Sequence, residues 1–391
     1  MEKIDPHKNK ERYIKWKRER ANLEMATLSE FNGKIWMRYI NDMETGLNVS
    51  AFHKKGSRSH IRLNTIRIRM YFLIRELEKR LNLIKVTDIT EEQIHQYFQS
   101  MRNGEIIRKD GKKFRSVGDY VQDFKAFWHW WMKLNKKQGI EMQDIGKDLD
   151  TSGEKPDWVY LTEEQIGKLA DSAKYEYKIL IWFLFDTGMR APTEVSNIKV
   201  SDFYNDFKEL NIRPEVSKTF GRRIKLMICS SLIKEYIKNK ELGKEDYLFK
   251  LSPTVTNRYL KRLGKSLFGD KVSLAGEKYS NLTLYDFRHC ASCYWLPRYK
   301  SESALKYRFG WKTSDKIHYY SELLGMRDTI TEDDVLLDVT KAEIEKDLEK
   351  TKNDNIILGE KVESLEKDLV IITKRLDKLT SIAIEKEMPI I

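Results

Sequence analysis

Residues 178–195 read KILIWFLFDTGMRAPTEV, and they carry the clearest structural signal in the chain. The first ten, Lys178–Thr187, are strongly apolar and predict a buried helix. This helix ends at Gly188-Met-Arg190, and Pro192 then stands where proline is favoured, in the first turn of a new helix. Packing can hold an arginine at such a junction while its guanidinium points outward, so Arg190 is a candidate phosphate ligand.

A β-hairpin is predicted directly downstream of this junction. Leu210–Arg213 and Arg222–Ile228 have strand character and flank Ser217–Gly221, which contains a glycine turn. Lys218 lies near the hairpin tip, before the turn, whereas Lys225 is a competing basic residue on the second strand.

Further helical patterning surrounds this region. Thr162 and Gln165 have capping-box spacing, so a second domain begins with a helix close to Trp158. Residues 254–325 return to helical periodicity. Within them Leu284–His289 opens a helix, and Gly310-Trp311 precedes Ile317–Tyr320. The expected fold class is mainly α with a small antiparallel β-sheet.

The N-terminal part has a helical period from about residue 28 to residue 139, with a second capping box at Thr90–Gln93. Before it, residues 1–26 form a basic arm that is helical or becomes ordered on contact. The aromatic run Phe127–Trp131 has the spacing of a helix core, although a base-stacking platform is the alternative. Residues 146–158 lack periodicity and are the interdomain linker.

The C-terminal tail shows a heptad pattern. Apolar residues and two polar ones follow each other in steps of three and four, and this predicts a coiled coil at 340–385. The seam consists of Leu348, Thr351, Asn355, Leu358, Val362, Leu365, Leu369, Ile372, Leu376 and Leu379. Asn355 at an a position favours a parallel dimer in one register. A long amphipathic helix folded onto its own body is the alternative.

Charge narrows the class of partner. The 391 residues carry a formal net charge of +12. Residues 331–391 hold 10 basic and 16 acidic side chains, so the tail is at −6 and residues 1–330 are at +18. A cationic body with an acidic tail points to a polyanionic partner, most simply nucleic acid.

Several other classes of protein are disfavoured. No run of 18 apolar residues exists, so we expect no membrane partner. Three cysteines make no disulfide framework and suit a reducing cytoplasm. The Cys290/Cys293 pair lacks further ligands, and we interpret it as core packing rather than a metal site. P-loop, GxGxxG, HExxH and nucleophile-elbow motifs are absent.

Five short motifs together resemble the tyrosine recombinases, the phage-type integrases and Xer-like enzymes. In order they are Thr187–Arg190 for the family's TGxR junction, Lys218 for its hairpin lysine, Arg288-His289 for the end of HxxRH, Gly310-Trp311 for G(H/W), and Tyr320 nine residues after Trp311. The resemblance spans about Leu28 to Leu323. Each motif alone is weak, but five in the correct order are specific.

Two positions depart from the family pattern. Tyr285 stands where HxxR normally begins with His, and a group of archaeal plasmid and virus integrases is similar in carrying Tyr there. Glu194 lies four residues after Arg190 rather than the usual three, which makes it a less certain partner for that arginine.

The resemblance implies a metal-independent reaction on DNA without a cofactor. Arg190 and Arg288 would clamp the phosphate oxygens bidentately, with Tyr285 and Trp311 supplying a hydrogen bond and packing. Tyr320 would be the nucleophile of a 3′-phosphotyrosine intermediate, with Tyr319 as its rival, and Lys218 the general acid. His289 would brace the site.

The implied architecture is a SAM-like helical core-binding domain (27–145) and a DNA breaking-rejoining catalytic domain (159–330). The implied function is site-specific recombination of double-stranded DNA, for integration or excision of a mobile element. It would involve self-association through the coiled coil, a tetramer in the synaptic complex, and a cytoplasmic, nucleoid-associated location. A type IB topoisomerase and a non-catalytic DNA-binding protein are the alternatives.

Overall fold

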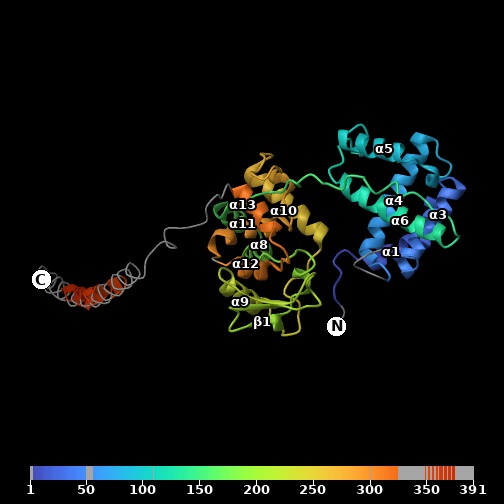
Figure 1. Cartoon of the computed structure of the whole chain (residues 1–391). Coiled ribbons are helices and arrows are strands. Elements are labelled where there is room, and N and C mark those ends of the chain that lie inside the picture. The colour runs from blue at the N-terminus through green and yellow to red at the C-terminus, as the bar shows by residue number, and fades with distance from the viewer. Residues whose placement is uncertain are drawn as a thin grey trace, which may run out of the picture. The chain divides into compact units, whose positions relative to one another are not determined.

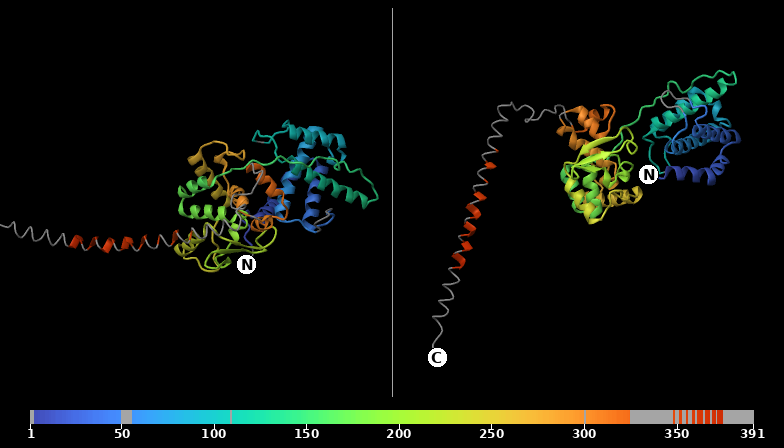
Figure 2. Two further views of the ribbon diagram at one scale, coloured as in Figure 1. Left: turned by 60° about the vertical axis from the view of Figure 1, so that its left-hand side comes forward. Right: turned by 90° about the horizontal axis from the view of Figure 1, so that it is seen from below.

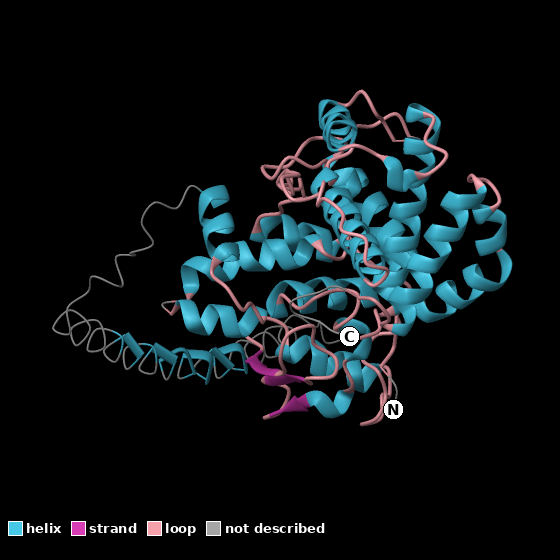
Figure 3. Cartoon of the chain, turned by 45° about the vertical axis from the view of Figure 1, so that its right-hand side comes forward, coloured by secondary structure: helices cyan, strands magenta, loops and turns pink. Residues whose placement is uncertain are grey.

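The structure is a computed structural model of the whole chain. It describes residues 3–49, 56–108, 110–299 and 301–324. In the tail it describes residues 348, 351–352, 355, 358–359, 361–363, 365–367, 369–370 and 372–374. Residues Met1–Leu324 form one compact unit, and Gly325–Ile391 are a second unit. The first unit is mostly helical with a small sheet, as Figure 3 shows.

Among its described residues, the N-terminal half of the first unit is helical apart from an isolated β-bridge between Ile107 and Lys113, and it shares one hydrophobic core. Its helices are α1 (Asn9–Glu19), α2 (Ala21–Met25), α3 (Glu30–Thr45), α4 (His60–Leu81), α5 (Glu91–Asn103) and α6 (Val117–Lys136), with a 3-10 turn at Val86–Asp88. Tyr13 and Trp16 of α1 are buried in the same core as Trp36. The basic N-terminal segment is therefore largely helical, because its aromatic residues find an apolar face to pack on.

Two sequence predictions in this half are confirmed. Thr90 and Gln93 form a reciprocal capping box at the start of α5, which satisfies two backbone N–H groups that helix geometry leaves free. In the aromatic run of α6, Phe127, Trp128 and Trp130 are buried in the core. These rings therefore stabilise the domain and are not available for stacking on bases.

Residues 137–157 contain no helix or strand and connect the two groups of helices, coloured blue to cyan and green to orange in Figure 1 and Figure 2. The second group comprises α7 (Glu163–Asp171), α8 (Tyr175–Thr187), α9 (Ser230–Asn239), α10 (Pro253–Phe268), α11 (Asp286–Trp295), α12 (Glu302–Phe309) and α13 (Asp315–Leu324). The predicted capping box between Thr162 and Gln165 begins α7.

The sheet differs from the predicted two-stranded hairpin. It is antiparallel and has three strands in the order β1 (Phe203–Tyr204), β2 (Glu209–Ile212) and β3 (Arg222–Lys225). The second predicted strand, Arg222–Ile228, was too long, because β3 ends at Lys225. After β3 the backbone N–H groups of Met227, Ile228 and Cys229 all donate to Asp186 Oδ2, at 2.8–3.0 Å. These donors are therefore taken from the ladder, and the strand ends.

The helix expected to begin near Pro192 is also absent. Residues 191–194 form turns, and only a 3-10 turn follows, at Val195–Asn197. The Glu194 side chain accepts from the Arg190 backbone N–H at 2.8 Å, while the Glu194 N–H donates to the Arg190 carbonyl at 2.8 Å. The second of these bonds has α-helical spacing, but the bonds from Asn197 to Glu194 and from Ile198 to Val195 are of the 3-10 type. The turn therefore does not continue as an α-helix, and the prediction of a new helix was wrong.

Most of the predicted coiled coil lies outside the described residues, including Leu376 and Leu379. The residues that are described between 348 and 374 are helical and exposed. Leu358, Val362, Leu365 and Leu369 are each more than half exposed. A helical, apolar and solvent-facing seam agrees with the heptad pattern, while pairing with a second chain stays a prediction.

Candidate active site

Arg190 emerges where α8 ends. Gly188 caps this helix with a positive φ of 57°, and a side chain there would collide with the Phe309 ring. The chain then turns, and the Arg190 guanidinium donates to Glu194 Oε1 at 3.0 Å and to the Gly310 carbonyl at 2.8 Å. Its side chain remains 17% exposed. Arg190 is thus held on two sides and keeps an open edge.

Arg288 approaches the same junction from α11, which packs on α8 and α13 (Figure 1). Its two terminal nitrogens donate to the carbonyls of Gly188 and Phe309, each at 2.6 Å. Burial, together with the positive charge of Arg190, lowers the pKa of Arg288 to about 10. It stays protonated at neutral pH, so two cationic guanidiniums meet at the ends of α8 and α12.

Glu194 joins the site in spite of its unusual spacing. It is almost completely buried and bonds both Arg190 and Arg222. Burial opposes its ionisation, but hydrogen bonds and charge from Arg222, and then from Arg190, lower its pKa to about 2. The turn at residues 191–194 brings Glu194 back to Arg190 despite the four-residue spacing.

Tyr320 lies on α13 and is only 3% exposed. Its hydroxyl is 2.6 Å from His289 Nδ1, and its ring stacks on Trp311 with centroids 5.8 Å apart. Burial raises the pKa of Tyr320. Burial, and then the charges of Arg288 and Lys316, lowers the pKa of His289 to about 3. The pair is therefore neutral, with Nδ1 as the acceptor of the tyrosine proton.

Tyr319, the rival nucleophile, has a different environment. Its hydroxyl accepts from Trp158 Nε1 at 2.8 Å and donates to the Pro156 carbonyl at 3.5 Å. These contacts tie α13 to the connection between the two groups of helices. Neither contact involves an arginine of the junction.

Lys218 lies in the loop between β2 and β3 and is exposed. Within the described part of the chain it has no hydrogen-bond or ion-pair partner. Its neighbour Thr219 donates through Oγ1 to the Gly310 carbonyl at 2.9 Å, the same oxygen that Arg190 contacts. The loop is therefore anchored at the arginine junction, while the Lys218 amine is free to reach a ligand.

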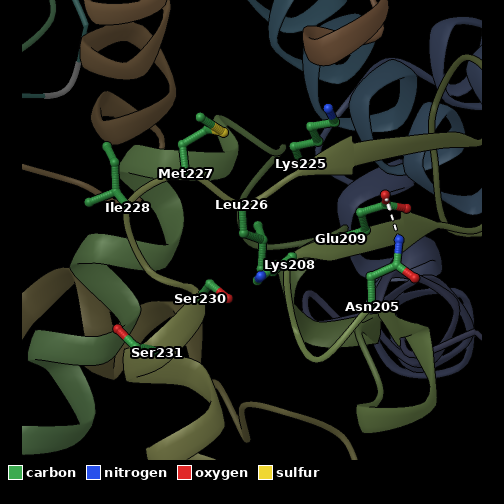
Figure 4. Close-up of a pocket in the computed structure, with 9 residues that line it drawn as sticks. All are labelled: Asn205, Lys208, Glu209, Lys225, Leu226, Met227, Ile228, Ser230 and Ser231. Atoms are coloured by element: carbon green, nitrogen blue, oxygen red, sulfur yellow. Dashed lines mark hydrogen bonds between the residues drawn. The ribbon is translucent and has the colours of Figure 1, made fainter. Parts of the chain in front are cut away.

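Lys225 is in a different place. It lines an open pocket of about 520 Å³ beside the start of α9, together with Glu209 and Met227 (Figure 4). None of the six predicted site residues lines this pocket. The geometry favours Lys218 over Lys225 as the basic residue of the site.

The sixth predicted residue, Tyr285, sits at the edge of the cluster. It is the residue before α11 and is 46% exposed. Its ring lies edge-on to His289, with centroids 5.1 Å apart. The structure thus brings Arg190, Arg288, Trp311 and Tyr320 together, with Lys218 on an anchored loop and Tyr285 beside them.

Sequence reasoning missed the roles of two residues. Arg222 was predicted only as the first residue of a strand, yet its side chain is fully buried against Glu194. The alternation of buried and exposed residues along β3 was a signal, since Arg222 falls on the same face as Ile224. His289 was assigned a bracing role, and no sequence signal indicated its contact with the Tyr320 hydroxyl.

No group of three or more His, Cys, Asp or Glu side chains that could hold a metal ion occurs in the part of the chain that the structure describes. Cys290 and Cys293 are buried, and burial raises the pKa of both thiols. Among the described residues, no helix is long and apolar enough to cross a membrane.

Comparisons with known proteins bear on the fold of the chain. No family model matches the chain, and no curated protein does. Among solved structures, a lambda integrase dimer bound to a core site matches with a TM-score of 0.56 at 15% identity, over 76% of this chain and 79% of that one. The Tn1549 transposon integrase in complex with transposon right-end DNA matches with a TM-score of 0.53 at 15% identity, over 80% and 98%.

The XerH site-specific recombinase bound to palindromic difH substrate, in a post-cleavage complex, is also similar, with a TM-score of 0.50 at 15% identity, over 68% of this chain and 77% of that one. The chain therefore has the fold of the tyrosine recombinases.

Proposed function

We propose that this protein is a site-specific DNA recombinase that cleaves and rejoins duplex DNA through a 3′-phosphotyrosine intermediate. The main support for this proposal is the junction at which Arg190 and Arg288 meet, with Tyr320 stacked on Trp311 beside it. The three similar proteins are integrases or recombinases in complex with DNA, which supports the same substrate class for this chain.

The arginine pair suits a phosphodiester under attack. Negative charge grows on the non-bridging oxygens in the transition state, and guanidiniums fixed beforehand stabilise it without reorganising. Arg190 and Arg288 are fixed by carbonyls of Gly188, Phe309 and Gly310. These carbonyls are neutral, and the Glu194 carboxylate that also holds Arg190 is shared with Arg222, so the cluster keeps a net positive charge for the phosphate.

The chemical step balances with Tyr320, Lys218 and solvent. The Tyr320 oxygen attacks phosphorus and its proton is released to solvent, because His289, with a pKa of about 3, is too weak a base to take it. The bond from phosphorus to the 5′-oxygen breaks, and Lys218 donates a proton to that oxygen. Because Tyr320 is only 3% exposed, α13 must move for the hydroxyl to reach a DNA phosphate.

The test of the nucleophile uses nicked DNA that carries the native target site, analysed by denaturing electrophoresis. Wild type should form a covalent adduct, Tyr319→Phe should form it too, and Tyr320→Phe should form none. Absence of an adduct with wild type would leave a DNA-binding protein without catalysis. Relaxation of supercoiled DNA without recombinant product would indicate a topoisomerase instead.

We assign duplex-DNA binding to both parts of the first unit, with residues 27–145 as the core-binding domain and 159–330 as the catalytic domain. Residues 1–330 carry a net charge of +18, which favours phosphate contacts. Affinity should fall steeply as salt rises, as measured by fluorescence anisotropy of labelled duplex. We also propose a cytoplasmic, nucleoid-associated location, and a role in mobile-element integration because one similar protein is the Tn1549 transposon integrase.

We further propose that the tail pairs two protomers. The described tail helix exposes Leu358, Val362, Leu365 and Leu369, and such a seam is stable only when covered. Light scattering should find a dimer of the full chain and a monomer after truncation at residue 335. A full-length monomer at all concentrations would contradict the coiled coil, and with it the route to a synaptic tetramer.

A further inference from the structure

Arg222 is an arginine with no exposure to solvent. Its side chain lies at 0% exposure on β3, between the site and α12. It donates from Nη2 to Glu194 Oε2 at 2.8 Å, from Nη1 to Glu194 Oε1 at 3.3 Å, and from Nε to the Arg308 carbonyl at 2.9 Å. Every nitrogen of the guanidinium therefore has a partner inside the protein, and none is left for DNA.

Glu194 links this buried cation to Arg190. One carboxylate accepts from both guanidiniums, with Arg190 at 3.0 Å and Arg222 at 2.8 Å. Two cations share one buried anion, so the cluster keeps a net positive charge, and Arg190 is its partly exposed member. A buried ion pair of this kind fixes the positions of its side chains but need not add to the free energy of unfolding.

The Lys218 loop is attached to the same cluster on both sides of the lysine. Ser217 Oγ donates to Glu194 Oε1 at 3.2 Å and accepts from Arg222 Nη1 at 3.2 Å. Thr219 Oγ1 donates to the Gly310 carbonyl, which also accepts from Arg190. Lys218 is thus the one free side chain in a tripeptide whose other two side chains are bonded to the arginine junction.

We propose that Arg222 is a positioning residue that sets Lys218 relative to Arg190, through its contacts with Ser217 and Glu194. The inference rests on the proposed function and adds a residue that touches neither substrate nor reacting atoms. Without Arg222 the loop loses an anchor, while Arg190 keeps Glu194 and Gly310. Loss of Arg222 should therefore slow protonation of the leaving 5′-oxygen by Lys218, and should leave the binding of the phosphate oxygens by the two arginines unchanged.

Leaving-group chemistry separates these two effects. In a DNA whose scissile 5′-bridging oxygen is replaced by sulfur, the bond from phosphorus to sulfur breaks and the thiolate leaves without taking a proton. A defect in the placement of the general acid should therefore vanish on this substrate. A defect in the clamp, or in folding, should persist on it.

The experiment measures single-turnover adduct formation by full-length Arg222→Met on both nicked substrates. On ordinary DNA we expect a loss of roughly 100-fold, and on the bridging phosphorothiolate a rate within about 5-fold of wild type. Arg223→Met is the matched control, since this neighbour on β3 is exposed and pairs with Glu209. It should match wild type on both substrates.

An equal loss on both substrates, or a wild-type rate of Arg222→Met on ordinary DNA, overturns the proposal. If Arg222→Met does not fold, Thr219→Val carries the test, because it removes only the bond from Oγ1 to Gly310. It should show the same rescue from a smaller loss, and a loss without rescue overturns the proposal equally. If wild type forms no adduct on either substrate, the proposed function itself fails, which is a separate result.

Discussion

Two buried arginine–carboxylate pairs lie in the second group of helices, and only one belongs to the candidate site. Asp186 pairs with Arg308 at 2.8 Å, with side chains 0% and 2% exposed. Glu194 pairs with Arg222 at 2.8 Å, with side chains 1% and 0% exposed. Burial and distance do not distinguish the pairs, so their roles must be found in what surrounds each carboxylate.

The Asp186 pair has partners that only hold the fold. Its carboxylate caps the N–H groups of Met227, Ile228 and Cys229, and Arg308 contacts the Asp186 backbone carbonyl and lies over the Trp295 ring. These contacts join the end of α8 to the end of β3 and to α12. The pair therefore fixes the chain path and presents no charge to solvent.

The Glu194 pair opens toward solvent through a third residue. Its carboxylate also accepts from Arg190, whose side chain is 17% exposed, and from Ser217 beside the exposed Lys218. A buried carboxylate shared with a partly exposed cation is the feature that marks a site here. The following substitutions test this distinction.

Arg190→Gln should cause the largest change in activity. Adduct formation should fall about 1,000-fold, because one fixed donor to the phosphate is lost. The melting temperature should change little, since Glu194 keeps Arg222. Arg298→Gln, an exposed arginine stacked on Tyr294, is the control and should react as wild type does. If Arg190→Gln lost stability as well as activity, the Glu194 pair would also hold the fold, and its role would not differ from that of the Asp186 pair.

Asp186→Asn should act on folding instead. It leaves the buried Arg308 without its counter-ion and should lower the free energy of unfolding by about 3 kcal/mol, measured with urea. Asp171→Asn breaks an exposed pair with Lys178 and should cost no more than about 0.5 kcal/mol. At low temperature, folded Asp186→Asn should still cleave DNA. Loss of cleavage in the folded variant would place this pair in the site as well.

His289→Phe should change how stability depends on pH. The pKa of His289 is about 3 in the folded protein, against 6.5 for an unperturbed histidine, so the unfolded chain binds more protons between these values. Wild-type stability therefore falls as pH decreases below 6.5, and His289→Phe should escape about 2 kcal/mol of this loss at pH 5. Parallel curves for the two proteins in urea unfolding from pH 7 to 5 would contradict a buried neutral imidazole.

Gly310→Ala should give the smallest effect. Gly310 has a φ of +62°, and an added Cβ would lie 3.1 Å from both Arg222 Nη1 and Thr219 Oγ1. Gly104→Ala is the matched control, because Gly104 is also a left-handed helix cap, with a φ of +84°, and an added Cβ would meet only the Lys113 side chain, with Cγ at 3.4 Å. Gly310→Ala should lose about 1 kcal/mol more in thermal unfolding than Gly104→Ala. Equal losses would mean that the cluster around Glu194 can shift to accept a methyl group.

Local chemistry was predictable from particular residues. The capping boxes at Thr90 and Thr162 and the apolar α8 are formed by neighbours in the sequence, and all three are present as predicted. The same holds for the loop that carries Lys218 between two antiparallel strands. One error arose where a distant partner intervened, since Asp186 ended β3 early. The helix expected near Pro192 was a local error, because only a 3-10 turn forms there.

The sequence by itself determined the helical character of both halves, the +18 charge of residues 1–330, and the order and spacing of the basic residues and Tyr320. Only the tertiary structure decided which of these residues share an environment. Arg222 meets Glu194 across 28 residues, Arg288 meets Gly188 across 100, and His289 meets Tyr320 across 31. Periodicity and capping act over one or two turns of chain, whereas these contacts exist only after helices from distant segments have packed.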